Sequence, residues 1–217
     1  MLRCIAIAGC SLVALVGTAR AQESGGFAIL RGTDTVAAEQ FSREEVQLSG
    51  TLVRQSGTAR ERVRYRATLV EDQSAPLIEL SAWRGDDPDD SPARQTTRLI
   101  FKDDSVAVDE ASRWAGVDTR ILATVRDPIP YLNLSTAFLE QATRRAGRTG
   151  GSDPVAVPFF NLGGGQTVTG SVGRLGRDSA TVRIGTVEFR LRVDGDGRIL
   201  GGSVPAQGLV IVRTGTH

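Results

Sequence analysis

Apolar and polar residues alternate with a period of two along most of the chain. Residues 62–69 show this clearly, because the apolar side chains of Val63, Tyr65, Ala67 and Leu69 alternate with arginines and a threonine. A period of two over seven or eight residues is typical of a β-strand that buries one face. Since the other face is polar, the pattern favours antiparallel strands, because parallel sheets are usually covered on both faces.

Turn-forming residues divide the chain into many such segments. The strongest turn pattern is Asp194-Gly195-Asp196-Gly197, because Asp and Gly tolerate positive φ angles. Besides residues 62–69, strands are expected over residues 27–31, 35–41, 46–52, 77–83, 96–101, 105–109, 119–126, 155–162, 165–175, 179–184, 187–194, 199–204 and 209–213. Short strands at this spacing predict a mainly β fold, with a single curved antiparallel sheet of half-barrel or barrel-like form.

One segment has helical rather than strand periodicity. Apolar residues recur in it three or four positions apart, namely Tyr131, Leu134, Phe138, Leu139, Ala142 and Ala146. Pro128 and Pro130 lie near the expected start, and Gly147 is placed to cap the C-terminus. We therefore expect one α-helix over residues 131–146, packed by its apolar face on the concave side of the sheet.

Residues that face inward from the sheet and the helix form the candidate ligand site. If the helix does not fill the concavity, these side chains line an apolar cavity. The candidates are Tyr65, Leu69, Tyr131, Leu134, Phe138, Phe189 and Leu191. The alternative is that the same side chains pack together as a solid core.

The N-terminus has the features of an export signal. Met1-Leu2-Arg3 is followed by an apolar stretch and then by Ala19-Arg20-Ala21. Cleavage after Ala21 would leave residues 22–217 as a single β-rich domain, periplasmic or secreted, with no transmembrane segment. A membrane anchor is disfavoured because the apolar stretch is shorter than the roughly 20 residues that span a bilayer. Lipidation at Cys10 is disfavoured because the apolar run before it is short.

Removal of residues 1–21 takes away both cysteines and two of the basic residues. Cys4 and Cys10 are the only cysteines, so the mature chain has no disulfide, thiol nucleophile or thiolate ligand. Of the 26 basic residues, Arg3 and Arg20 also leave, and 24 remain beside 25 acidic ones. A balance this close to neutrality argues against nucleic-acid binding, which needs a basic excess.

Several catalytic and metal-binding chemistries lack their residues. The single histidine is His217, at the C-terminus, so neither a histidine base nor a histidine metal site is expected. Gly163-Gly164-Gly165-Gln166 lacks the Lys-Ser or Lys-Thr pair and the helix of a phosphate-binding loop, which favours a β-turn. The acids of residues 86–90 lack the spacing of a calcium loop, which favours a solvated loop. We expect no metal and no cofactor.

Two sets of charged residues leave other functions open. Carboxylates alone can hydrolyse glycosides, and the candidates in regular elements are Glu39, Glu79, Glu140 and Glu188. Pairing with arginine on neighbouring strands is the favoured role for them. The four arginines on one face of residues 60–66 could bind an anionic partner, although a solvated face balanced by acids is favoured.

Together these features resemble one group of bacterial envelope proteins. The resemblance rests on the export signal, the N-terminal segment FAILRGTDTVAAEQF, the apolar helix and the late hairpin VEFRLRVDGDGRIL. It points to the envelope half-barrel proteins, which include periplasmic lipoprotein carriers and related uncharacterised proteins. It implies a curved antiparallel sheet that wraps around helical structure and holds acyl chains in its apolar concavity. Those carriers place more than one helical segment inside the sheet, whereas this sequence predicts one.

Three functions follow as hypotheses. The leading one is a non-catalytic binding module for an apolar or amphiphilic ligand, such as a lipid or a lipoprotein acyl chain. The first alternative is a structural or interaction module with a solid core, which binds an envelope protein through edge strands or the arginine face. The second is a carboxylate-dependent hydrolase of envelope polymers, which needs two acids about 5–10 Å apart. A hollow interior favours the ligand-binding module, and a packed interior favours the structural or interaction module.

Overall fold

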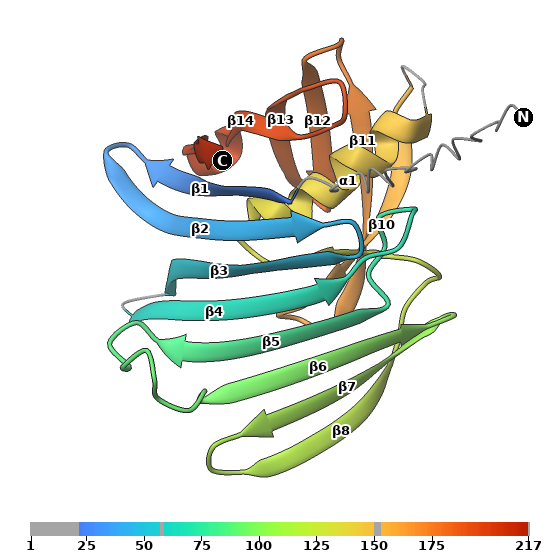
Figure 1. Cartoon of the computed structure of the whole chain (residues 1–217). Helices are drawn as coiled ribbons and strands as arrows, with labels where there is room; N and C mark the ends of the chain where they lie inside the picture. The colour runs from blue at the N-terminus through green and yellow to red at the C-terminus, as the bar shows by residue number, and fades with distance from the viewer. Residues whose placement is uncertain (1–21, 57–58, 150–152, 217) are drawn as a thin grey trace, which may run out of the picture.

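Fifteen β-strands of one sheet and one α-helix account for most of the described residues, which are 22–56, 59–149 and 153–216 of the computed structural model (Figure 1). The expected signal peptide, residues 1–21, lies outside this set. The strands are β1 Glu23–Arg31, β2 Asp34–Glu44, β3 Gln47–Ser56, β4 Ala59–Thr68, β5 Leu77–Arg84, β6 Gln95–Lys102, β7 Ser105–Ser112, β8 Gly116–Ala123, β9 Ile129–Tyr131, β10 Val155–Asn161, β11 Gln166–Arg174, β12 Ser179–Ile184, β13 Val187–Val193, β14 Ile199–Val204 and β15 Leu209–Thr216. The helix is α1, Thr136–Thr149, and a short 3-10 helix, η1, covers Pro205–Gln207.

The order of the strands follows the chain closely. The sheet runs β8-β7-β6-β5-β4-β3-β2-β1-β15-β14-β13-β12-β11-β10-β9, so the first and last strands are neighbours in its middle. Every pair is antiparallel except β9 with β10, which is parallel. The expected fold, a mainly β protein with one curved antiparallel sheet packed around one helix, is confirmed, and the parallel β9–β10 pair is the one exception among the described strands.

The period-two pattern places one side of each strand in the core. In β4, Val63, Tyr65 and Ala67 are buried while Arg64 and Arg66 are exposed. The same phase continues into β3 through the register of Leu52 with Val63 and Gly50 with Tyr65. The hydrophobic face of the sheet is therefore concave and continuous from strand to strand, as the alternation predicted.

The sheet curls until its two ends approach each other, but it does not close. The hydroxyls of Thr124, just after β8, and Thr167 in β11 are hydrogen-bonded at 2.8 Å. No backbone ladder joins β8 to β11 among the described residues, and β8 and β9 are the two edges of the sheet. The fold is thus an open, barrel-like sheet whose edge strands, β8 and β9, are each paired with a neighbouring strand on one side only.

The helix begins later than the sequence predicted. Residues 129–131 pair with β10 as strand β9, and Leu134 has a φ of 66°, so neither Tyr131 nor Leu134 belongs to α1. Ser135 caps the helix, because its hydroxyl oxygen accepts a hydrogen bond from the Phe138 N–H at 3.3 Å. The helix also continues through Gly147, the expected cap, to Thr149. Strand pairing and the Ser135 cap, both absent from the apolar periodicity, set the true start.

A buried carboxylate fixes the N-terminus of α1 to the sheet. Glu39 of β2 accepts backbone N–H bonds from Thr136 at 2.8 Å and Ala137 at 2.9 Å. It also accepts the hydroxyls of Tyr65, at 2.8 Å, and Ser135. Burial raises the pKa of the Glu39 carboxyl, and the four donors oppose that rise by stabilising the ionised form. The helix is therefore held by a polar anchor as well as by apolar contact.

A second buried carboxylate fixes the body of the helix. Glu140 of α1 accepts hydrogen bonds from Arg213 of β15 at 3.0 Å, from Arg144 at 2.8 Å and from the Ile199 N–H at 2.8 Å. Glu23 of β1 bridges the same two arginines, at 2.7 Å from Arg144 and 2.9 Å from Arg213. A buried charge is costly unless it is paired, and here each carboxylate is shared between arginines. The cluster ties α1 to β1, β14 and β15.

We expect the stability advantage of the wild type over a Glu39→Gln variant to shrink as the pH rises above 4.5, the ordinary pKa of a glutamate. A raised pKa means that the folded state holds its proton at pH values where the unfolded state has lost it. The free energy of unfolding then falls as the pH rises from the pKa of Glu39 in the unfolded state to its pKa in the folded state, by at most about 1.4 kcal/mol per pH unit. Urea unfolding of both proteins from pH 4 to pH 8 measures the difference. An advantage that grows with pH would show instead that the donors depress the pKa.

We expect Gly50→Ala to destabilise the protein by about 1–3 kcal/mol. A Cβ at this position would lie 2.3 Å from the Tyr65 Oη and 2.5 Å from the Gln40 carbonyl oxygen. The Tyr65 ring cannot move away easily, because its hydroxyl is bonded to Glu39. Thermal or urea unfolding checks the value. Gly195→Ala is the control, because a Cβ there meets nothing within 4 Å, and equal losses in both variants would contradict the packing argument.

Candidate binding cleft

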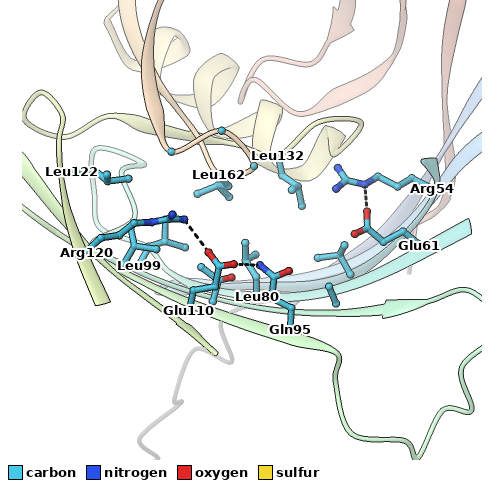
Figure 2. A pocket seen from close by; sticks show the side chains of 17 residues that line it. Arg54, Glu61, Leu80, Gln95, Leu99, Glu110, Arg120, Leu122, Leu132 and Leu162 are labelled. Atoms are coloured by element: carbon cyan, nitrogen blue, oxygen red, sulfur yellow. Dashed lines mark hydrogen bonds and ion pairs between the residues drawn. The ribbon is translucent and has the colours of Figure 1, made fainter. Parts of the chain in front are cut away.

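A cleft of about 540 Å³ lies on the concave face of the sheet, beside the helix (Figure 2). Its walls come from β3 to β8, from Leu132 and Leu162, and from the turn of residues 163–165 between β10 and β11. This volume is within the range of small-molecule sites in proteins.

The cleft exists because one helix cannot cover a sheet of this length. Helix α1 packs against β2, β9, β11, β12 and β14. Figure 1 shows α1 at the end of the molecule where β1 and β10–β14 lie, while β5–β8 extend away from it. Phe101 of β6 packs on Phe160 of β10, with ring centroids 5.1 Å apart. The neighbouring part of β5–β8 faces Leu132, Leu162 and the turn, and a hollow is left between them.

Apolar side chains form the floor of the cleft. They share the inward phase of their strands and are Val63, Leu80, Ala82, Leu99, Val108 and Leu122. Leu132 and Leu162 face them from the opposite wall, as Figure 2 shows. Val63, Leu99, Val108, Leu132 and Leu162 are already buried, whereas Leu80, Ala82 and Leu122 keep part of their surface exposed. An apolar group in the cleft would therefore be buried mainly against these three side chains, which favours its binding by about 0.8 kcal/mol for each buried methylene.

Charged and polar side chains line the rest of the cleft. At one end, Arg54 donates to Glu61 at 2.8 Å and to the Asn133 carbonyl oxygen at 2.9 Å. At the other end, Glu110 accepts from Gln95 at 2.8 Å and from Arg120 at 2.9 Å (Figure 2). Two arginines and two glutamates therefore lie in the cleft with no net charge. Such a lining suits a ligand that carries hydrogen-bonding groups as well as an apolar part.

The residues that we expected to form the ligand site lie elsewhere. Tyr65, Leu69, Phe138 and Leu191 are buried in the core, and the rings of Tyr65 and Phe138 are in contact with centroids 4.9 Å apart. The space between helix and sheet is thus packed at this point. None of the seven candidates lines the cleft.

The other three candidates lie together near the start of α1. Tyr131, Leu134 and Phe189 line a small crevice of about 20 Å³. Burial raises the pKa of the Tyr131 hydroxyl, so this group stays protonated near neutral pH. A crevice of this size holds no more than a water molecule, so the cleft is the better candidate site.

Strand phase could have identified the cleft residues. Arg54 follows Leu48, Gly50 and Leu52 in the inward phase of β3, and Glu110 follows Val106 and Val108 in β7. A charged residue in an inward phase is either buried with a partner or exposed in a hollow. The site candidates taken from the sequence were all apolar or aromatic, so these charged residues were missed.

The four candidate catalytic acids do not line the cleft. Glu39 and Glu140 are buried and hydrogen-bonded as described above. Glu79 is on the outer face of β5. Glu188 accepts from Arg183 at 2.7 Å and from Arg190 at 3.0 Å, and these bonds lower its pKa. Glu140 and Glu188 are therefore paired with arginines, and Glu79 lies on the outer face of the sheet. Glu39 holds the start of the helix, so all four acids have structural positions.

The acidic loop of residues 85–93 is tied to arginines. Asp87 accepts two hydrogen bonds from Arg94, which lower the pKa of its carboxyl to about 2. Asp89 pairs with Arg62, whose guanidinium also lies over the ring of Trp83 at 5.2 Å. The arginine row on the outer face of β4 is thus partly balanced by this loop. Within residues 22–56, 59–149 and 153–216, no cluster of three potential metal ligands is found.

Comparisons with known proteins give the fold but no function. No family model matches the chain, and no curated protein matches it. In the same described ranges, no helix has the length and apolar character needed to cross a bilayer.

Two solved structures are similar to this one. A protein of the DUF1089 family from Pseudomonas aeruginosa aligns with a TM-score of 0.57 and 11% identity, over 79% of this chain and 91% of the other. A β-barrel-like protein of the domain of unknown function DUF1849 from Brucella abortus aligns with a TM-score of 0.52 and 7% identity, over 89% of this chain and 95% of the other. At these identities the likeness shows a shared fold alone. The chain therefore has the fold of β-barrel-like bacterial proteins whose function is not known.

Proposed function

We propose that this protein is a non-catalytic binding module of the bacterial envelope, and that it holds an amphiphilic ligand in the cleft. A lipid or the acyl chain of a lipoprotein has the required chemistry. The observation that carries the proposal is the cleft over β4–β8, in which the partly exposed side chains of Leu80, Ala82 and Leu122 lie beside polar side chains from the same strands. The leading hypothesis from the sequence is thereby kept, with its site moved from beneath the helix to the sheet beside it.

The shape of the cleft supports a ligand with an apolar part. Leu80, Leu99 and Leu122 come from three different strands and form one surface. Leu132 and Leu162 lie opposite this surface. Leu99, Leu132 and Leu162 are already buried, so an apolar chain in the cleft would lie against the partly exposed Leu80 and Leu122, and burial of that surface favours binding.

The polar lining supports a ligand with a polar part as well. Glu110 and Arg120 are paired, but both keep part of their side chains exposed, so they can still bond to a ligand or to water. The paired charges cancel, which favours a neutral or zwitterionic headgroup over a strongly anionic one.

The envelope location rests on the expected export signal at residues 1–21. The packed core beneath α1 also agrees with the interaction module that we considered as an alternative. The open cleft beside that core favours the binding module, because a solid interaction module has no need of it.

We expect the purified mature chain to take up a fluorescent fatty acid, and an Ala82→Trp variant to bind it at least about tenfold more weakly, a loss of about 1.4 kcal/mol. Ala82 lies on the floor of the cleft, so an indole there would occupy the ligand's place. Fluorescence titration measures the affinity, and mass spectrometry of extracts from the purified protein identifies lipids that it carries from the cell.

Ser81→Trp is the matched control. Ser81 is next in the chain but lies on the outer face of β5, where it pairs with Thr96. It should bind the probe as the wild type does, and circular dichroism should show both variants folded. Absence of co-purified lipid together with no uptake by the wild type would refute the proposal. An equal loss in both tryptophan variants would place the ligand outside the cleft.

A further inference from the structure

Strand β8 presents an exposed edge of the sheet. It pairs with β7 on one side and with no strand on the other among the described residues, and only its C-terminal end approaches β11, where the hydroxyls of Thr124 and Thr167 are hydrogen-bonded. Seven of its eight residues are exposed. Unpaired strand edges offer N–H and C=O groups that can form a ladder with another strand, and soluble proteins usually protect them. This edge is eight residues long and carries no proline, bulge or lysine.

The hydrogen-bonding phase of β8 can be read from its register. The Thr124 N–H donates to the Asp104 carbonyl oxygen at 2.8 Å, which continues the β7–β8 ladder. Alternate residues in an antiparallel ladder bond to the same neighbour. The even-numbered residues of β8 therefore bond to β7, and Val117, Thr119 and Ile121 direct their backbone groups to the free side.

The sequence of β8 is complementary to itself in the antiparallel direction. In a pairing centred on Thr119, Val117 of one copy lies opposite Ile121 of the other, and Asp118 lies opposite Arg120. The residues with free backbone groups face each other, so the phase allows about six backbone hydrogen bonds. The opposite charges fall on one face and the apolar pairs on the other, and both kinds of pair are favourable across strands.

Neighbouring registers lack this match. Moving the centre by one residue to Asp118 places two aspartates opposite each other. Moving it to Arg120 places two arginines opposite each other. Like charges in direct opposition destabilise a strand pair, so the charges select the register centred on Thr119.

Within one chain, Asp118 of β8 has no positively charged partner among the described residues. Asp118 lies opposite Glu110 of β7, which is another acid. The Asp118 side chain makes no ion pair or hydrogen bond with any described residue, whereas Glu110 is bonded to Gln95 and Arg120. A second copy would bring its Arg120 beside Asp118 and supply the missing positive charge.

The apolar face of β8 is exposed in a single chain. Val117 is 71% exposed and Ile121 is 68% exposed, on the convex side of the sheet. The register places Ile121 beside Ala107 of β7, and Ala107 beside Ile100 of β6. Pairing with a second copy would extend this apolar row across the junction to the partner's Val117.

We propose that two copies of this protein associate through β8, antiparallel and in the register centred on Thr119. The two-fold symmetry of that pairing makes the same edge serve both copies. Because an edge contact alone is smaller than the standard interface of about 1,600 Å², we expect a weak dimer with a dissociation constant in the micromolar range.

Sedimentation velocity across concentrations from about 1 to 500 μM, the range of a micromolar equilibrium, tests the association. The mature wild type should shift from monomer to dimer. Asp118→Arg and Arg120→Asp should each weaken self-association at least about tenfold, because each places like charges opposite each other. An equimolar mixture of the two variants should recover the dimer, because the two arginines on β8 of one variant then face the two aspartates on β8 of the other.

Recovery in the mixture also shows that both single variants are folded. Thr119→Pro is an independent variant, because it removes the N–H at the centre of the free edge without touching the bonds to β7. It should be monomeric with an unchanged circular dichroism spectrum. A wild type that is monomeric at every concentration, single variants that self-associate normally, or a mixture that fails to recover the dimer would each overturn the proposal.

Discussion

The shape of this protein depends on a mismatch between the area of its sheet and the area that one helix can cover. Fifteen strands present a continuous apolar concave face, and α1 has only 14 residues with which to fill it. At about 1.5 Å per residue such a helix is about 21 Å long. It packs against β2, β9, β11, β12 and β14 and does not extend over β5–β8 (Figure 1). The cleft and the free edge of β8 both lie in the uncovered part, so one mismatch accounts for both candidate binding surfaces.

Polar contacts decide where the helix lies, because apolar contact alone would allow it to slide along a surface of similar side chains. Glu39 accepts four hydrogen bonds at the start of α1, and Glu140 is bonded to Arg144 and Arg213 one turn later. Both carboxylates are fully buried, so any shift of the helix would leave a buried charge without its donors. These costly groups therefore specify one position of the helix, and with it the position of the cleft beside it.

The strands could be predicted from the sequence because each depends on its own alternation, as Val63, Tyr65 and Ala67 show in β4. The apolar periodicity did not give the start of the helix, because that start depends on the pairing of β9 with β10, on the Ser135 cap and on Glu39, which lies 97 residues before Thr136 in the chain. The cleft was missed for a similar reason. Its position depends on which strands the helix leaves uncovered, and a periodic pattern treats every inward face alike. The inward phase of Arg54 and Glu110 did carry information, since a charge in that phase has to be paired or exposed to solvent.

The two proposed surfaces share strand β8, and this has a thermodynamic consequence. Arg120 lies in the cleft and bonds to Glu110, and in the proposed dimer the same side chain faces Asp118 of the second copy. A ligand that draws Arg120 towards the cleft would weaken the contact with Asp118, and a dimer that draws it outward would change the polar lining of the cleft. Binding free energies that depend on one side chain are linked, and the effect of each event on the other is equal in size. The occupancy of the cleft and the association of two copies would therefore report on each other through Arg120.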